Sequence, residues 1–252
     1  MKFPENWLRE HVSTTASHDT LSTCLTAIGL EVEEDTAIGG TLGGVVVAEI
    51  LSLQKHPEAD RLNVCQVAVG NGHAVQIVCG APNARAGLKA PLAQIGAELP
   101  GGFEIKAAKL RGVESFGMLC SAKELAIDAD AAGLLELPED APVGTALAEY
   151  LGLPDARFEL KLTPNRADCF SIRGIAFDLA AALDSQVKAL EIPEAPVGSA
   201  RSVEVGVDIE ALADCPRYCG RGIEGLNADA KTPLWMSEKL KRSGIRPISP
   251  LV

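Results

Sequence analysis

Basic side chains cluster in the glycine-rich stretch between residues 77 and 125, where they could hold phosphate groups. Lys106, Lys109 and Arg111 form the centre of this cluster. Further cations close by in the sequence are Arg85, Lys89 and Lys123. Lysine and arginine gathered on one face are the usual electrostatic footprint of a nucleic-acid contact, so the cluster suggests a basic groove.

An ordinary solvated surface explains the same residues, because glutamates interleave with them. These are Glu104, Glu114 and Glu124. Lys106 and Lys109 would also point to opposite faces of a regular strand, and they converge only if the strand bulges near Ala107–Ala108. Charge alone therefore leaves RNA contact and a solvated face both open.

No local pattern for catalysis accompanies the basic cluster: the chain has no Gly-x-Ser-x-Gly, no P-loop and no His-Glu-x-x-His. The four histidines stand apart among polar or turn residues, and we expect each of them at the surface: His11, His18, His56 and His73. Cys215 and Cys219 form a single close pair, whereas a structural zinc site needs four ligands. We predict no catalytic residue, no metal site and no cofactor bound by this chain.

The composition bounds the class of protein. Hydrophobic residues make up 47% and charged residues 23% of the 252 positions, as in a protein with a buried core. The net charge of -11 argues against a general polyanion binder but leaves room for a local basic face. Seven scattered cysteines suggest reduced thiols, and no apolar run is long enough for a signal peptide or a membrane span. We expect a soluble, cytoplasmic protein.

Short strands separated by glycine-rich turns predict a small antiparallel β-barrel from about residue 45 to about residue 137. The first strand should cover residues 45–53, and the turn after it residues 56–61. The apolar positions of the next strand change phase, which predicts a bulge near Val64–Cys65.

Helical segments flank this barrel on both sides. Before it, a short helix is expected from Trp7 to Val12, then a second one that starts at Ser17 or Asp19 and stops at Gly29. After it, Thr163–Asp168 reads as a turn, with Asp168 as the cap of a helix. This helix has one apolar stripe: Ile172, Ile175, Ala176, Leu179 and Leu183. We expect it to pack on residues 1–38.

The third part of the chain is expected to follow a linker at residues 191–200. It begins with alternating Val203, Val205 and Val207, typical of a strand, and continues to a helix at residues 233–242. A unit of roughly fifty residues that ends on an apolar segment is poorly supported by itself, so we expect the sequence to be part of a longer chain.

The motifs of the central stretch go beyond a fold class. They are His56–Cys65, Ile77–Asn83, Gly96–Gly102, Leu110–Val113 and Ser115–Ser121. Together they resemble the tRNA-binding OB-fold domain found in several synthetase-associated proteins. The flanking motifs narrow the match: Leu162–Cys169, Cys215–Tyr218, Trp235–Met236 and Gly244–Arg246. With them, the whole chain resembles the N-terminal third of the bacterial phenylalanyl-tRNA synthetase beta subunit.

The resemblance implies a multidomain α+β protein in which an OB-fold β-barrel is inserted into a small split α+β domain, followed by the start of a third α+β (editing) domain. The corresponding divisions are 1–38 and 151–191 for the split domain, 39–150 for the tRNA-binding domain and 200–252 for the truncated editing domain. In this family the editing domain hydrolyses mischarged tyrosyl-tRNA, which supplements the rejection of tyrosine by one hydroxyl.

The resemblance also implies partners and contact residues. The family assembles two alpha and two beta subunits, and the alpha subunit uses ATP and Mg2+ to charge tRNA(Phe) with phenylalanine. Candidate RNA contacts carried over from the tRNA-binding domain are Lys106, Lys109, Arg111 and Ser115. The editing pocket, the magnesium site of the beta subunit and the anticodon-binding module correspond to positions beyond Val252, so no catalytic residue is carried over.

Two other functions remain to be weighed. A free-standing OB-fold tRNA-binding or chaperone protein would need residues 45–137 alone, and the motifs on either side of that stretch count against it. A DNA-binding regulator would use the helices in 1–38 and 169–183, but neither carries the basic face that duplex binding requires.

Overall fold

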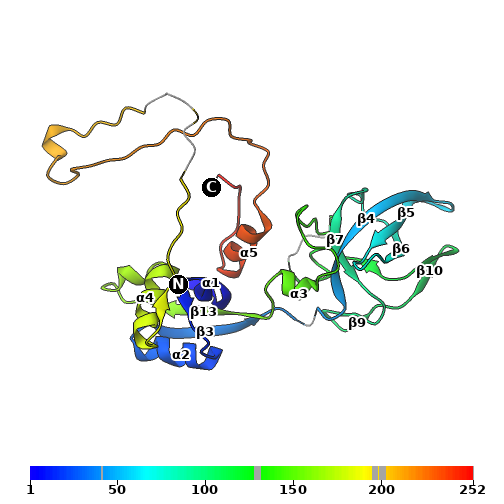
Figure 1. Cartoon of the computed structure of the whole chain (residues 1–252), viewed down its shortest axis with the longest axis horizontal. Coiled ribbons are helices and arrows are strands. Elements are labelled where there is room, and N and C mark those ends of the chain that lie inside the picture. Colours follow the sequence, from blue (N-terminus) through cyan, green and yellow to red (C-terminus); the bar gives the residue numbers. More distant parts are fainter. Residues whose placement is uncertain (41, 128–131, 195–197, 199–202, 252) are drawn as a thin grey trace.

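The computed structural model describes residues 1–40, 42–127, 132–194, 198 and 203–251. It shows a mixed α/β protein in which helices accompany several separate sheets. Two folded bodies lie side by side, and a long irregular segment precedes the C-terminal helix, which lies next to the bodies (Figure 1).

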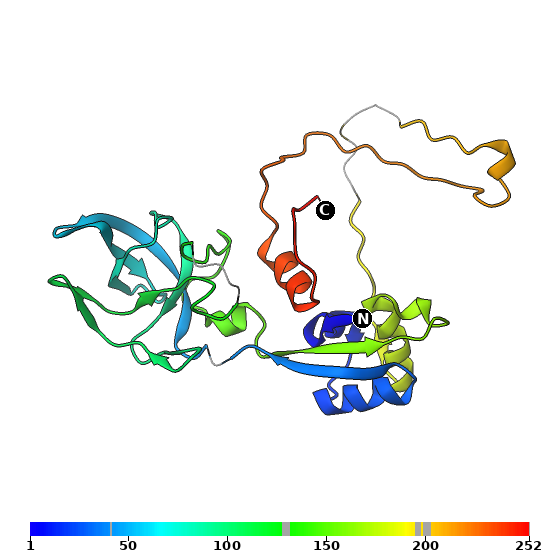
Figure 2. The same cartoon turned by 180° about the vertical axis from the view of Figure 1, so that it is seen from behind.

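The first body is built from two segments of the chain, one before and one after the second body. Its leading half contains β1 (Lys2–Pro4), α1 (Glu5–His11), β2 (Val12–Ser13), α2 (His18–Ala27) and β3 (Glu31–Ile38). Its second half contains β13 (Asp155–Lys161), the 3-10 helix η1 (Ala167–Cys169), α4 (Ile172–Ala182) and β14 (Gln186–Val187). β13 lies between β1 and β3 in an antiparallel sheet, and β14 pairs with β2. Figure 2 shows β3 and β13 running together toward the second body.

Local capping explains where α2 begins and ends and where α4 begins. The Ser17 side chain accepts a hydrogen bond from Thr20 N, and Gly29 takes the left-handed conformation just after α2, as predicted. The predicted cap of α4 is wrong, because Ser171 caps that helix by accepting from Gly174 N. Asp168 lies in η1 instead.

One apolar core joins the two halves of the first body. Its largest fully buried members are Phe3, Leu8, Leu21, Leu25, Leu30, Phe158, Leu160 and Ile175. The stripe of α4 lies in the same core, with Leu183 partly buried at its edge. This confirms that the helix after residue 171 packs on the first 38 residues.

The second body is organised on a five-stranded sheet with the order β12-β7-β4-β5-β6. The strands are β4 (Val45–His56), β5 (Ala59–Ala68), β6 (Ala74–Cys79), β7 (Lys89–Ala93) and β12 (Met118–Leu119). Two short hairpins extend it, β8 (Glu98–Leu99) with β9 (Phe103–Glu104) and β10 (Ala108–Leu110) with β11 (Val113–Ser115). The short helix α3 (Leu147–Tyr150) precedes the return to the first body.

The predicted barrel is not closed by strand pairing within the described residues. β12 and β6 are the edges of the sheet, and no continuous ladder joins them. Single hydrogen bonds bring the edges near each other, from Phe116 N to Gln76 O and from Val78 N to Ser115 Oγ. Individual hydrogen bonds, rather than strand pairing, therefore connect the two edges of the sheet.

The predicted bulge at Val64–Cys65 is also wrong. The β5–β6 ladder runs without a shift from Asn63 to Ala68. The irregularities lie in the pairing with the neighbouring strand β4 instead, where Leu51 is skipped between Ile50 and Ser52 and a second register shift follows between Lys55 and His56. An extra residue on either strand of a pair can absorb the same change of phase, and the sequence of one strand does not reveal which partner carries it.

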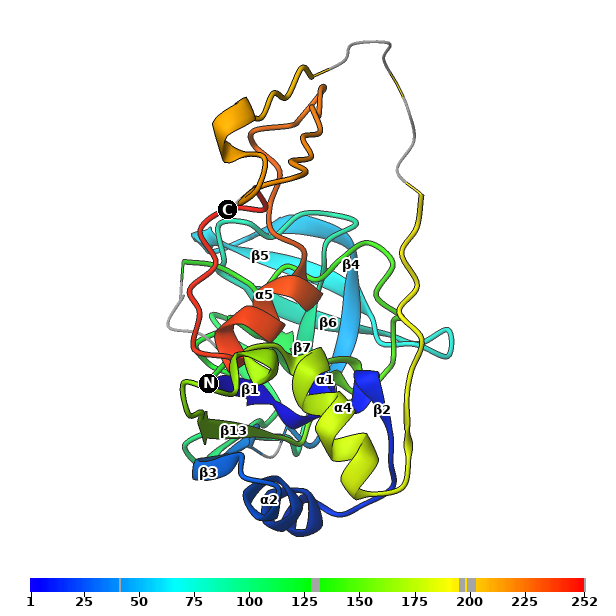
Figure 3. The same cartoon turned by 90° about the vertical axis from the view of Figure 1, so that its left-hand side faces the viewer.

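The third part of the chain contains little regular structure apart from its final helix. The alternating valines at 203–207 form no strand, because none of the described segments pairs with them. The 3-10 helix η2 (Ile209–Ala211) and then α5 (Leu234–Arg242) follow, the latter where the sequence predicted it. Figure 3 shows α5 next to the first body while the preceding stretch stands away from both bodies. The expected linker at 191–200 falls partly outside the described residues. None of the helices in the described part of the chain could span a lipid bilayer.

Candidate nucleic-acid interface

The β10–β11 hairpin presents the predicted basic residues at its tip. Its two turn residues, Arg111 and Gly112, have φ values of +44° and +88°. A two-residue turn with both φ values positive matches the twist of the strands, and it normally carries asparagine or glycine at the first position. Arginine there costs roughly 1 kcal/mol of backbone strain. The strained turn places Arg111, with its guanidinium group, at the exposed tip of the hairpin.

Lys109 and Lys106 lie on the approach to this tip. All of β10 is exposed, and Lys109 has no ion-pair partner within the described part of the chain, although it faces Glu114 across the hairpin. Lys106 pairs with Glu104 at 3.0 Å, with both side chains more than half exposed. Such a pair contributes about 0 to 1 kcal/mol, so a phosphate can replace the glutamate. Residues 105–107 form no strand, so the two lysines are not held on opposite faces of one.

The tip of the neighbouring β4–β5 hairpin braces this element. Figures 1 and 2 show the two hairpins ending at the same edge of the molecule. His56 Nε2 lies 3.0 Å from Leu110 O, and Arg111 Nη1 donates to Glu58 O at 3.3 Å. His56 is only 4% exposed, which corrects the expectation that every histidine lies at the surface. The motif that begins at His56 was the sequence signal for this role.

Ser115 lies beneath the hairpin rather than at its surface. It is 3% exposed, and its hydroxyl accepts from Val78 N and donates to Gly117 O, both at 3.1 Å. These bonds anchor the base of the hairpin to β6. Of the four candidate residues, the structure thus brings Lys109, Arg111 and Ser115 together on one hairpin and leaves Lys106 in the connection before it.

The wider basic groove is smaller than the sequence suggested. Arg85 forms two 3.0 Å hydrogen bonds with Glu136, and these bonds, with one from Asn83, lower the pKa of Glu136 to about 2. Lys89 Nζ donates to two backbone carbonyls, Glu139 O and Ala141 O. Both cations therefore stabilise the second body itself, whereas Lys123 is exposed.

Two exposed aromatic rings that flank the basic residues in the sequence escaped the sequence analysis. Phe103 on β9 is 61% exposed and Phe116, between β11 and β12, is 40% exposed. Exposed aromatic faces can stack on unpaired bases. Aromatic residues make up only 4% of the chain, so two phenylalanines on either side of the basic residues were the signal in the sequence that could have revealed them.

A second polar cluster, in the Leu162–Cys169 motif, is occupied by an arginine. Asp168, Cys169 and Asp178 have ligand atoms within 4.8 Å of one another. The Arg166 guanidinium donates to both carboxylates, and its hydrogen bond to Asp168 lowers the pKa of that carboxyl to about 2. A guanidinium already neutralises the cluster, so its chemistry suits a structural ion-pair network rather than a divalent metal site.

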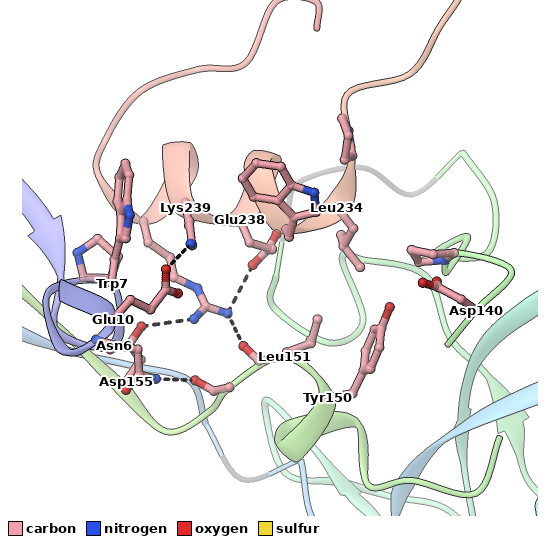
Figure 4. Close-up of a pocket in the computed structure, with 16 residues that line it drawn as sticks. Asn6, Trp7, Glu10, Asp140, Tyr150, Leu151, Asp155, Leu234, Glu238 and Lys239 are labelled. Atoms are coloured by element: carbon pink, nitrogen blue, oxygen red, sulfur yellow. Dashed lines mark hydrogen bonds and ion pairs between the residues drawn. The ribbon is translucent and has the colours of Figure 1, made fainter. Parts of the chain in front are cut away.

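A cavity of about 610 Å³ lies between α1, α3 and α5. Figure 4 shows Trp7 and Glu10 from α1, Tyr150 from α3, and Glu238 and Lys239 from α5 around it. Lys239 forms an ion pair with Glu10 at 2.6 Å, so two charged residues that line the cavity neutralise each other. This ion pair connects α5 to α1 of the first body.

Comparison with known protein families gives matches to two separate parts of the chain. Residues 45–146 match a family described as a tRNA binding domain, and residues 214–252 match the family described as B3/4 domain. A crystal structure of a MetRS related protein from Pyrococcus horikoshii covers 40% of this chain and 85% of its own, with 26% identity. Its TM-score of 0.31 is too low to establish a shared fold.

Individual curated proteins are similar to this chain over its whole length. A phenylalanine–tRNA ligase beta subunit from Xanthomonas axonopodis pv. citri is 65% identical over 253 residues, covering 100% of this chain and 31% of the relative. The Xylella fastidiosa (strain 9a5c) beta subunit is 58% identical over 252 residues, with the same coverage. The chain spans about a third of the length of these curated relatives. Over its whole length, the chain is therefore similar to part of phenylalanine–tRNA ligase beta subunits.

Proposed function

We propose that this chain supplies a tRNA-contacting surface and a scaffold to a phenylalanine–tRNA ligase, as part of its beta subunit. The observation that carries the proposal is the β10–β11 hairpin, because its exposed Lys109 and strained Arg111 lie inside the segment that matches a tRNA binding domain. The net charge of -11 limits RNA contact to such a local patch.

Within this proposal, each candidate residue has a distinct task. Lys106, Lys109 and Arg111 contact phosphates, which requires exposed positive charge and no particular base sequence. Ser115 acts indirectly, since its buried hydroxyl anchors the hairpin that carries the cations. Phe103 and Phe116 offer stacking faces for unpaired bases beside them.

The activity of the whole enzyme extends the proposal beyond the chain itself. The ligase would charge tRNA(Phe) with phenylalanine using ATP and Mg2+, in a cytoplasmic assembly of two alpha and two beta subunits. In this arrangement residues 39–150 form an OB-fold domain inserted into a split domain of residues 1–38 and 151–191. Residues 200–252 would open the editing domain, in keeping with the B3/4 match at 214–252. The carboxylates around Arg166 do not suit the Mg2+, because the guanidinium already neutralises them.

The test is the salt dependence of tRNA(Phe) binding by this chain. Each phosphate contact contributes about 0.7 to 0.9 to the slope of log K against log salt concentration. Replacing Lys106, Lys109 and Arg111 together by alanine should lower the slope by roughly 2 to 3. A matched control removes three exposed cations elsewhere, Lys161, Arg217 and Arg221, and should leave the slope unchanged. Equal slopes for the triple variant and the unaltered chain would refute the assignment.

A free-standing tRNA-binding protein is the less favoured alternative. It would need only the second body, whereas the similarity to ligase beta subunits continues through the first body and α5. Binding of the alpha subunit of the ligase by a protein that contains this chain would support the subunit role. A self-contained protein that binds tRNA without such a partner would support the alternative.

A further inference from the structure

We propose that His56 is a positioning residue for RNA binding: it fixes the β10–β11 hairpin so that Lys109 and Arg111 face a phosphate backbone together. The inference rests on the proposed tRNA-binding function and goes beyond it, because His56 itself makes no contact with RNA. His56 stands at the end of β4, on the element next to the basic hairpin.

The hydrogen bonds of the ring determine its protonation pattern. Leu110 O can only accept, so Nε2 carries the hydrogen of the 3.0 Å bond between them. Glu58 N can only donate, and it lies 3.1 Å from Nδ1, so Nδ1 is the acceptor. His56 is therefore the neutral Nε2–H tautomer, with one nitrogen holding its own turn and the other holding the neighbouring hairpin.

The hairpin needs such a brace. Among the described residues β10 pairs only with β11, in a sheet of two strands. An isolated two-stranded hairpin is marginally stable in water, so contacts from outside determine where its tip stands. Ser115 anchors the base of the hairpin, while His56 and Glu58 hold the tip through Leu110 O and the Arg111 side chain.

Burial separates His56 from the cations that it positions. Its side chain is almost completely buried, whereas Lys109 and Arg111 are exposed. A phosphate can therefore reach the cations but not the imidazole. Loss of the bond to Leu110 O would leave the tip with the longer bond from Arg111 to Glu58 O, so the two cations would be held less firmly in one arrangement.

Two substitutions separate the two nitrogens of the ring. The amide of glutamine can place a donor near the position of Nε2, so His56→Gln keeps a bond to Leu110 O. Asparagine is shorter and can replace Nδ1 as an acceptor for Glu58 N, but it does not reach Leu110 O. His73→Ala is the control, because His73 is an exposed histidine on the β5–β6 turn.

The readout is again the salt slope of tRNA(Phe) binding by the full chain. We expect His56→Asn to lower the slope by about 0.7 to 1.8, corresponding to one or two phosphate contacts, and His56→Gln and His73→Ala to keep it. A merely structural role would reduce the folded fraction and the apparent affinity, but the protein that remains folded would bind with the unchanged slope.

Each outcome decides the matter. An unchanged slope in His56→Asn, or an equal loss in both His56 variants, overturns the positioning role. If the triple cation variant described above keeps its slope, the proposed function fails instead. Should His56→Asn not fold, the 15N resonances of the imidazole in the unaltered chain provide the test. A predominant Nδ1–H tautomer would contradict the proposed bond, and an Nε2–H tautomer is the expected result.

Discussion

Arg242, in the last turn of α5, forms an ion pair with Asp155, the first residue of β13. The Nη1–Oδ2 distance is 3.0 Å, the Asp155 side chain is 1% exposed and the Arg242 side chain 12%. Figure 4 shows Asp155 below α5. Arg242 also donates to Leu151 O at 2.8 Å. This buried contact joins α5 to a body from which it is separated by a long stretch of irregular chain.

Replacing Arg242 by methionine should detach α5 from the first body. Within the described residues, the substitution leaves a buried carboxylate with only the backbone donors Asn6 N and Ala156 N, and we expect a loss of about 3 kcal/mol. Amide hydrogen exchange in α5 and urea unfolding would measure it. Lys239→Met is the control on the same helix, because its pair with Glu10 is partly exposed and should cost less than about 1 kcal/mol. Similar effects of the two substitutions would contradict this account.

The stability of the first body should depend on the charge of His18. The ring lies between Glu5 and Asp35, at 2.5 Å and 2.8 Å, and stacks on Phe158. Burial opposes the charged form, but the hydrogen bonds to Glu5 and Asp35 outweigh it and raise the pKa of His18 above 6.5. A raised pKa in the folded state stabilises the protein below pH 6.5, and this stabilisation disappears as the pH rises through the folded value.

The measurement is the free energy of unfolding of the unaltered chain and of His18→Gln at pH 5.5 and at pH 9. The difference between the two proteins should be larger at pH 5.5. A difference that grows toward pH 9 would show that the ring stabilises the body in its neutral form.

Replacing Arg111 by asparagine should change stability and RNA binding in opposite directions. Asparagine adopts the left-handed conformation more easily than arginine, so the hairpin should gain up to about 1 kcal/mol. The same change removes a cation and should lower the salt slope of tRNA binding by about 0.7 to 0.9. Thermal unfolding and binding titrations test both parts. A loss of stability in this variant would mean that the bond from Arg111 to Glu58 O outweighs the strain.

Gly174 should not tolerate alanine, although it lies within a helix. In an exposed helix the change would stabilise the protein by about 1 kcal/mol. Here a Cβ on Gly174 would lie 1.9 Å from Asp168 O, an overlap with backbone that cannot be relieved by a side-chain rotation. We expect a net loss of roughly 2 kcal/mol or more in urea unfolding. Gly43→Ala is the control, since nothing lies within 4 Å of that position.

Local patterns predicted the elements that depend on neighbouring residues. Ser17 and Gly29 mark the ends of α2, and the apolar stripe of α4 predicted the face that packs on the first 38 residues. These predictions hold because capping and amphipathic periodicity act over a few residues. The alternating valines at 203–207 show the limit, because a strand also needs a partner.

The candidate site was predicted less completely than the fold. Residue type and family resemblance selected Lys106, Lys109, Arg111 and Ser115, but they did not separate exposed cations from a buried anchor. His56 was expected at the surface because its neighbours in sequence are polar. Its hydrogen-bond partner is the carbonyl oxygen of Leu110, which lies 54 positions away, so no local pattern could reveal the contact.

The sequence by itself determined the family resemblance, the positions of most helices and strands, and the residues able to meet a phosphate, because these follow from residue type, spacing and short-range order. The tertiary structure alone decided which cations are free and which are used internally, where the bulge lies, and that the sheet remains open. It also decided that α5 returns to Asp155 and that His56 braces the hairpin. Those outcomes depend on contacts between segments distant in the chain, whose geometry is set only when the cores have packed.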